Sequence, residues 1–208
     1  MLLVLFHKWN IINGVMARYE YAMLKFVLLG ALSYRALTGY QLKQFVDRSA
    51  KHFWYAQTSQ IYRTLESLQK EGLLISEREE RGDAENGHER RIYSLTEQGR
   101  SDLLAWLKAP MTEIAPTKDA LLVRLFFSAQ IDKTDVLTQL RLQRALHAEQ
   151  LALLRNQIVE DIRQSAQQNP HIARDAILWD ATRRMGELTE EAYVRWLDET
   201  IQRIENEL

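Results

Sequence analysis

Residues 55–72, YAQTSQIYRTLESLQKEG, determine the fold class that this sequence predicts. Their aliphatic side chains recur four and three residues apart, which places them on one face of a helix: Ile61, Leu65 and Leu68. Thr58 or Ser59 is the expected N-cap, because a hydroxyl can accept from a free amide at the helix start. Gly72 is the expected residue after the helix, since glycine adopts positive φ without strain. The other face carries hydroxyl, amide and guanidinium groups that suit phosphates and base edges.

Short helices and a basic hairpin flank this stretch. Helical spacing predicts helices over 22–33 and 39–49 before it, the second with Tyr40 on its core face. After it, apolar and basic residues predict two strands within 73–95, joined by a polar turn that contains an Asn-Gly pair. Three helices followed by a hairpin are the order of a winged helix-turn-helix domain. We therefore expect the helix over 58–71 to be a recognition helix and the hairpin to be its wing.

The best domain boundary lies between Pro110 and Pro116. It separates an N-terminal winged-helix domain, residues 21–109, from a C-terminal domain, residues 117–208. Residues 1–20 show no sustained period, and we interpret them either as a frayed terminus or as an additional packing helix.

The C-terminal domain is predicted to be helical throughout. Thr117 is expected to cap a helix over 118–129, Asp132 to cap a long helix that ends near Gln168, and a last helix to span 172–207. Because these helices bury little core by themselves, their apolar stripes are expected to pair with a second copy of the chain. The residues expected in the dimer interface lie on those stripes: Leu137, Leu140, Leu151, Leu154, Ile158, Met185, Leu188, Trp196 and Ile201. The predicted fold class is mainly α with a small β-hairpin, in which an all-helical dimerisation domain follows the winged helix-turn-helix.

Composition limits the class of protein. The 208 residues contain no cysteine, which excludes disulfides and thiolate metal sites. The net charge of −1 divides unevenly, because residues 1–110 hold 15 Lys and Arg against 12 Asp and Glu. The longest apolar run after Met1 is five residues, Leu2–Phe6, far below the roughly 20 that cross a bilayer. We expect a cytoplasmic protein without a membrane segment.

The sequence also contains no arrangement typical of catalysis. The five histidines are scattered without metal-ligand spacing, and there is no phosphate-binding loop or Gly-rich dinucleotide turn. We therefore predict no enzyme activity, no metal and no cofactor.

The candidate DNA-binding residues lie on the recognition helix, the helix before it and the hairpin. They share hydrogen-bonding or cationic side chains: Lys43, Thr58, Ser59, Gln60, Tyr62, Arg63, Thr64, Arg78, Arg81, His88, Arg90 and Arg91. The alternative for the helix is a solvated polar face. The alternative for the hairpin is that its basic residues form ion pairs with its many acidic residues. Tyr62 could equally stack on the DNA backbone or cover the core.

Several other residues have two interpretations. Phe53 and Trp54 could form an aromatic ligand site, but we favour a core role beside the recognition helix. Trp196 is assigned to the dimer interface before a ligand pocket. Arg144 and His147 interrupt the apolar seam of the long helix, where we expect them to set its register.

Several short stretches, taken together in their order and spacing, resemble the PadR family of transcriptional regulators. They are Leu28–Leu32, Thr38–Leu42, Phe53-Trp54, Ser59–Tyr62, Glu71–Leu73, Arg90–Thr96 and Gly99. Residues 176–197 are also similar to the helical C-terminal domain of the longer, virulence-regulator-like PadR subgroup. One difference is Arg63, where many members have proline, so no base preference is transferred.

The resemblance implies a dimeric repressor that binds double-stranded DNA and, in some members, is released by a small effector such as a phenolic acid. The operator, the target genes, the sign of regulation and any effector of this chain are not specified by its sequence. A winged-helix scaffold for protein interactions, without specific DNA binding, is the alternative hypothesis. A helical ligand-binding protein with secondary DNA contact is a third.

Overall fold

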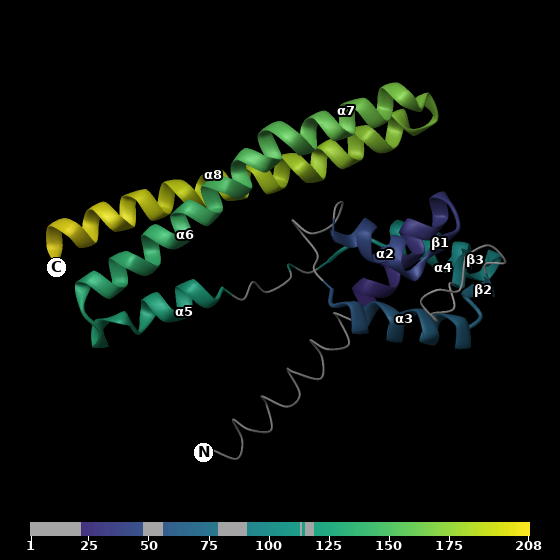
Figure 1. The fold of residues 1–208 in the computed structure, drawn as a ribbon, viewed down its shortest axis with the longest axis horizontal. Helices are drawn as coiled ribbons and strands as arrows, with labels where there is room; N and C mark the ends of the chain where they lie inside the picture. The colour runs from purple at the N-terminus through teal and green to yellow at the C-terminus, as the bar shows by residue number, and fades with distance from the viewer. Residues whose placement is uncertain (1–21, 48–55, 79–90, 113, 115–118) are drawn as a thin grey trace, which may run out of the picture. The chain divides into compact units, whose positions relative to one another are not determined.

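The computed structural model describes residues 22–47, 56–78, 91–112, 114 and 119–208 (Figure 1). These residues belong to two compact units, Met1–Ile114 and Ala115–Leu208.

The first unit consists of short helices and a small sheet. A helix over residues 22–34 precedes its labelled elements: β1 (Leu37–Thr38), α2 (Gly39–Phe45), α3 (Thr58–Lys70), β2 (Leu74–Arg78), β3 (Arg91–Leu95) and α4 (Glu97–Lys108). The three antiparallel strands have the order β1-β3-β2, with Leu37 opposite Tyr93 and Ser76 also opposite Tyr93. The predicted fold class, mainly α with a small β-hairpin, is confirmed.

One aliphatic core holds the first unit together. Its fully buried side chains come from residues 22–34, α2 and α3: Leu28, Leu29, Leu42, Ile61, Leu65 and Leu68. The face of α3 predicted from the spacing of Ile61, Leu65 and Leu68 is therefore the buried face. Burial of each such leucine or isoleucine stabilises the fold by about 1.5–3 kcal/mol, so this face fixes how α3 is presented.

Local hydrogen bonds set where the helices begin. Thr38 caps α2 as predicted, because its hydroxyl accepts from Gln41 N at 3.2 Å while Gln41 Oε1 accepts from Thr38 N at 2.9 Å. For α3 the predicted cap is wrong: Thr58 already lies inside the helix and Gln57 is the N-cap residue. Tyr40 was also misassigned, since its side chain is 66% exposed rather than part of the core.

The second unit is helical. Its elements are α5 (Ala120–Phe126), a 3-10 turn η3 (Ser128–Gln130), α6 (Lys133–Leu153), a π-helical segment η4 (Leu154–Ile158), α7 (Val159–Gln168), a 3-10 turn η5 (Pro170–Ile172) and α8 (Ala173–Glu207). Figure 1 shows α6, η4 and α7 as one long run that lies against α8. Asp119 caps α5 by accepting from Leu121 N and Leu122 N, so the predicted start after Thr117 is wrong.

The seam of the long helix packs inside a single chain. Leu137, Leu140 and Leu154 are buried there, and Leu140 shares a core cluster with Val136 and Leu197. These three leucines therefore do not form a free dimer surface, which corrects their predicted role. The apolar stripe alone could not distinguish a partner helix in the same chain from one in a second chain.

Polar residues of the seam also pair across this intramolecular interface. Arg144 binds Asp198, with Nε and Oδ1 2.8 Å apart. His147 Nδ1 lies 2.5 Å from Glu190 Oε2. Because both partners lie on α8 of the same chain, these contacts fix the register of α6 against α8.

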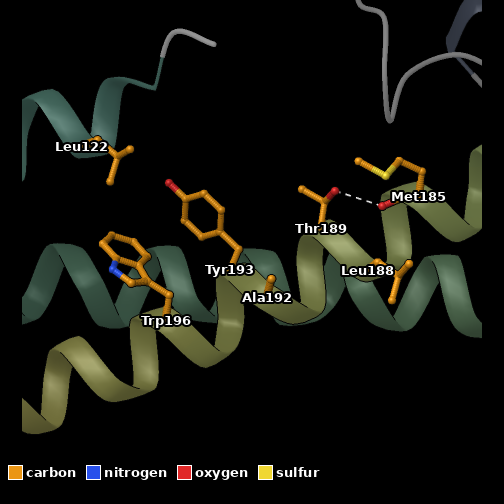
Figure 2. A pocket seen from close by; sticks show the side chains of 7 residues that line it. All are labelled: Leu122, Met185, Leu188, Thr189, Ala192, Tyr193 and Trp196. Carbon is orange, nitrogen blue, oxygen red and sulfur yellow. Dashed lines mark hydrogen bonds between the residues drawn. The ribbon is translucent and has the colours of Figure 1, made fainter. Parts of the chain in front are cut away.

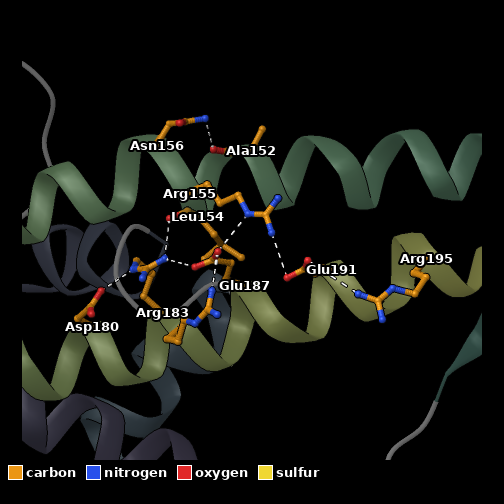
Figure 3. Close-up of polar contacts among 10 residues, drawn as sticks. Ala152, Leu154, Arg155, Asn156, Asp180, Arg183, Glu187, Glu191 and Arg195 are labelled. Atoms are coloured by element: carbon orange, nitrogen blue, oxygen red, sulfur yellow. Dashed lines mark hydrogen bonds and ion pairs between the residues drawn. The ribbon is translucent and has the colours of Figure 1, made fainter.

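A buried ion cluster lies next to η4 (Figure 3). Arg183 donates to the Leu154 carbonyl at 3.2 Å and to Glu187 at 2.7 Å. Arg155 and Arg184 also bind Glu187, at 3.1 and 2.7 Å. Their hydrogen bonds lower the pKa of Glu187 from its ordinary 4.5 to about 2.

Candidate nucleic-acid interface

The start of α3 presents a polar, solvent-exposed face. Thr58, Ser59, Gln60, Tyr62 and Arg63 are all exposed there. This face lies opposite the buried residues of the same helix, so packing of the core presents the polar side chains outward.

Thr64 is the exception among the predicted contacts of α3. Its side chain is only 2% exposed, and it is a buried residue of the helix. The prediction that Thr64 contacts DNA is therefore wrong. Its hydroxyl resembles those of its exposed neighbours in sequence, but its position on the helix falls beside Ile61 and Leu65.

Hydrogen bonds hold two of the exposed side chains against the helix. Gln60 Oε1 accepts from Gln57 N at 2.8 Å, which closes the helix start. Arg63 Nε donates to Ser59 O at 3.3 Å, and Arg63 Nη2 lies 3.5 Å from Ser59 Oγ. Gln57 was not among the predicted site residues, because the usual capping pair has a serine or threonine, not a glutamine, three residues before the second glutamine.

Tyr62 sits over the first residue of α2. A Cβ atom on Gly39 would lie 2.6 Å from the Tyr62 ring, so a larger residue at this position would displace the ring. Tyr62 nevertheless remains 42% exposed. One part of the ring therefore packs on α2 and another faces solvent, and contact of Tyr62 with the DNA backbone stays a prediction.

The wing places two arginines side by side. Arg78 of β2 is opposite Arg91 of β3, so their side chains leave the same face of the sheet. Tyr93, two residues along β3, is buried, and burial together with nearby Tyr62 and Glu66 raises its pKa while Arg91 opposes the rise. Tyr93 in β3 therefore lies near Tyr62 and Glu66 in the middle of α3.

A junction of hydrogen bonds fixes the wing to the end of α3. The Thr96 hydroxyl donates to Gly72 O and Leu73 O at 2.9 and 3.0 Å, and it accepts from Gly99 N at 3.0 Å. A Cβ atom on Gly99 would lie 2.2 Å from Leu73 O, which explains why glycine stands there. Gly72 has φ +73°, as expected for the residue that ends the helix.

The remaining predicted residues fall into two groups. Lys43 is partly buried and binds Asp47 on its own helix, so its charge is already neutralised locally. The other group lies outside the described residues: Phe53, Trp54, Arg81, His88 and Arg90. Among the residues that the structure describes, no cluster could hold a metal ion and no helix is long and apolar enough to cross a membrane.

The second unit carries an apolar groove beside α8. It has a volume of about 570 Å³ and is lined by one residue of α5 and six of α8: Leu122, Met185, Leu188, Thr189, Ala192, Tyr193 and Trp196. Figure 2 shows these side chains along one side of α8, with Leu122 approaching from α5. Three predicted interface residues, Met185, Leu188 and Trp196, therefore line a surface that is open in the single chain. Leu151, Ile158 and Ile201 are partly buried.

Comparison with known proteins gives two family matches. Residues 28–105 match the transcriptional regulator PadR-like family, and residues 117–205 match the C-terminal region called virulence activator alpha C-term. The chain is 25% identical over 189 residues to the negative transcriptional regulator PadR of Bacillus subtilis, covering 89% of this chain and 99% of that protein.

Solved structures show the same fold. The crystal structure of Bacillus subtilis PadR in complex with operator DNA has a TM-score of 0.72 at 23% identity, covering 88% of this chain and 97% of the other. The crystal structure of the same protein in complex with p-coumaric acid has a TM-score of 0.63 at 21% identity, covering 90% of this chain and 98% of the other.

Proposed function

Because this chain belongs to the PadR-like family of transcriptional regulators, we propose that it represses transcription as a homodimer on operator DNA. As a member of that family it is a DNA-binding regulator and not an enzyme. Each subunit would insert α3 into a major groove and lay the wing along the sugar-phosphate backbone. Its site of action would be the cytoplasm, where the DNA of a bacterial regulator lies.

The exposed polar start of α3 is the observation that carries this proposal. Its buried face is fixed by the core, and its outer face offers hydroxyl, amide and guanidinium groups within a single helical turn. Such groups make most protein contacts to phosphates and base edges. The paired Arg78 and Arg91 at the wing supply the positive charge that backbone contacts require.

Arg63→Ala tests the proposal. Wild-type protein should bind a labelled fragment of its own upstream region more tightly than random DNA, with an affinity that falls steeply as salt rises. Arg63→Ala should weaken that binding roughly 5- to 150-fold, the range for loss of one good base contact. Arg203→Ala is the matched control, because it removes the same charge from an exposed ion pair in the second unit.

Undiminished affinity of Arg63→Ala would exclude Arg63 from the interface. Salt-insensitive binding, or no preference over random DNA across a genomic fragment screen, would instead favour the protein-interaction scaffold.

The outer side of α8 is the proposed dimer surface. Apolar side chains recur there at intervals of three and four residues, and all are exposed: Leu178, Ala181, Met185, Leu188 and Ala192. This outer stripe faces away from the seam with α6. It is continuous with the groove, since Met185, Leu188 and Ala192 also line the groove. An exposed apolar stripe with this spacing is suited to a second helix.

Charges beside the outer stripe favour an antiparallel copy of α8 as the partner. If Met185 packs against Leu188 of the partner subunit, the two-fold axis passes between residues 186 and 187. The same register places Arg184 at the level of Thr189 of the partner subunit, about 3 Å along the helix axis from Glu191 of the partner subunit, twice in each dimer. The Arg184 and Glu191 side chains are partly exposed and already hold ion pairs within one chain, so they can bridge to the second copy without losing burial.

The residues that line the groove also favour a second protein chain, rather than an aromatic acid, as its occupant. None of its seven lining residues is cationic, and the Tyr193 hydroxyl already donates to Asp119. A carboxylate such as that of p-coumaric acid would find no counter-charge on this lining. We therefore assign the groove to the dimer, and thermal-shift assays with p-coumaric acid test whether an effector binds elsewhere.

A further inference from the structure

Gln60, at the exposed start of α3, turns its acceptor toward the backbone and its hydrogen-bond donor outward. Its Oε1 accepts from Gln57 N at 2.8 Å. Since the backbone group is a donor, the side-chain atom that faces it must be the carbonyl oxygen, which fixes the orientation of the amide. The Nε2 amino group is consequently the end that a ligand meets.

Arg63, one turn later, likewise presents only hydrogen-bond donors to a ligand. A guanidinium group has five N–H donors and no acceptor. Its Nε donates to Ser59 O at 3.3 Å, and its Nη2 lies 3.5 Å from Ser59 Oγ, so one edge of the guanidinium faces the helix. The two N–H groups of Nη1 and the second N–H of Nη2 are left for a ligand, in the fork geometry that suits two acceptors at once.

The two side chains act on neighbouring positions of the DNA. Residues three apart are adjacent on a helix surface, with Cβ atoms about 5–6 Å apart. Base pairs rise by about 3.4 Å, so the targets of Gln60 and Arg63 lie one or two base pairs apart.

Major-groove base edges differ in the groups that they offer. Guanine presents two acceptors, N7 and O6, and thymine presents the acceptor O4, whereas adenine presents an acceptor beside the N6 donor. Glutamine commonly reads adenine through its oxygen and its amino group together. In Gln60 the Gln57 N–H takes one of the two acceptor positions of the oxygen and turns that oxygen toward the helix start, so the adenine N6 group would face the Nε2 donor instead.

Resting on the proposed function, we propose that Gln60 and Arg63 select acceptor-bearing edges and reject adenine. Arg63 pairs with both acceptors of one guanine. Gln60 donates to a guanine or a thymine one or two base pairs away. The hydrogen bond that begins the recognition helix thereby sets the base preference of its first turn.

Gln60→Glu is the decisive variant. It keeps the shape of the side chain and an oxygen that accepts from Gln57 N, so α3 still begins at the same place. The outward atom changes from a donor to an acceptor. Wild type, Gln60→Glu and Arg63→Ala, all full-length, are each used to select sites from a library of random-sequence duplexes, with thermal melting as the check on folding.

The expected outcome is three different selected sites. Wild type enriches a guanine for Arg63 and a guanine or thymine for Gln60. Arg63→Ala loses the first preference, and Gln60→Glu shifts the second toward cytosine or adenine, whose exocyclic amines donate. Replacing the Arg63 guanine with 7-deazaguanine removes one acceptor, and wild-type affinity should fall roughly 5-fold or more, while Arg63→Ala barely responds.

Two failures are distinguishable. If wild type enriches a site that neither substitution alters, the proposed roles of Gln60 and Arg63 are wrong, although the protein still binds specific DNA. The same conclusion follows if wild type enriches an adenine that Gln60→Glu no longer selects. If wild type enriches no sequence, the proposed function itself fails.

Discussion

At the scale of single residues, neighbours in sequence differ sharply in role. Arg63 is exposed on the polar face of α3, whereas Thr64 is buried beside the core. Both residues were predicted to contact DNA because both side chains can form hydrogen bonds. Helical phase separates them, because Thr64 follows Ile61 by three residues and therefore falls on the apolar face that the aliphatic spacing predicted.

Gly99 tests the junction between the wing and α3. In Gly99→Ala the new Cβ would meet Leu73 O at 2.2 Å, so Leu73 and the start of α4 must move apart. We expect the free energy of unfolding to fall by about 1–3 kcal/mol, as for other overpacked sites. Urea denaturation followed by circular dichroism measures the change. Gly30→Ala is the control, because nothing lies within 4 Å of a Cβ at that position. Equal effects of the two substitutions would contradict the close contact.

Glu187 gives the second unit a predictable acid sensitivity. Its pKa in the folded chain is about 2, below its ordinary 4.5, because Arg183, Arg184 and Arg155 bind the charged form. A carboxyl group with a lowered pKa stabilises the fold above its ordinary pKa, and this stabilisation is lost as pH falls from about 4.5 toward 2.

Glu187→Gln should remove that part of the pH dependence. It should also destabilise the chain at pH 7 by roughly 1–3 kcal/mol, since it removes one of the two carboxylates that pair with the buried Arg183 and leaves only Asp180. Thermal melting of both proteins between pH 7 and pH 2 should show the difference shrinking as the pH falls. A difference that stays constant across this range would mean that the cluster does not hold Glu187 ionised.

At the scale of elements, apolar spacing predicted the faces of the helices better than their ends. The buried face of α3 and the cap of α2 followed from spacing and from a hydroxyl at the right position. The cap of α3 and the start of α5 did not, because Thr58 and Ser59 are better N-caps by residue type than Gln57, and because Asp119 competes with the nearby hydroxyl of Thr117. The short strand β1 and the π-helical segment η4 depend on contacts with distant residues, Tyr93 and Arg183, which local patterns do not contain.

The cap of α2 is open to a direct measurement. Thr38→Ala removes the hydroxyl that accepts from Gln41 N, and we expect a loss of about 1 kcal/mol in the free energy of unfolding. Thr38→Ser retains the hydroxyl and should restore most of that loss. Comparable stability of the alanine variant and wild type would show that the cap contributes little.

At the scale of the whole molecule, the sequence predicted a DNA-binding domain and a helical dimerisation domain. It assigned part of the apolar surface of the second domain to the wrong contact. The seam leucines of α6 and η4 were expected to face a second chain, and they instead pack on α8 of the same chain. The predicted dimer surface was partly wrong because α8 carries two apolar stripes: one contacts α6 of the same chain, and the other remains exposed. Only the three-dimensional arrangement identifies which stripe is free to pair.

Leu188 tests the dimer surface. Leu188 is 46% exposed on the outer stripe of α8, and Leu188→Glu would place two like charges at the proposed two-fold axis. We expect at least a tenfold weaker dimer by sedimentation equilibrium, the effect of about 1.4 kcal/mol. Leu142→Glu is the matched control, because Leu142 is 59% exposed on α6 and lies off that stripe. Equal dissociation of both variants, or of neither, would contradict the assignment.

Hydroxyl-radical footprinting of the full-length protein on its own upstream region tests the central claim most directly. A two-fold dimer that places one α3 in each half-site predicts two protected patches related by symmetry, with centres about 34 Å apart or a multiple of that distance. Arg63→Ala should lose both patches together, since each subunit contributes the same helix. A single unsymmetrical patch, or protection that Arg63→Ala leaves unchanged, would contradict the account of a dimeric regulator that reads DNA through α3.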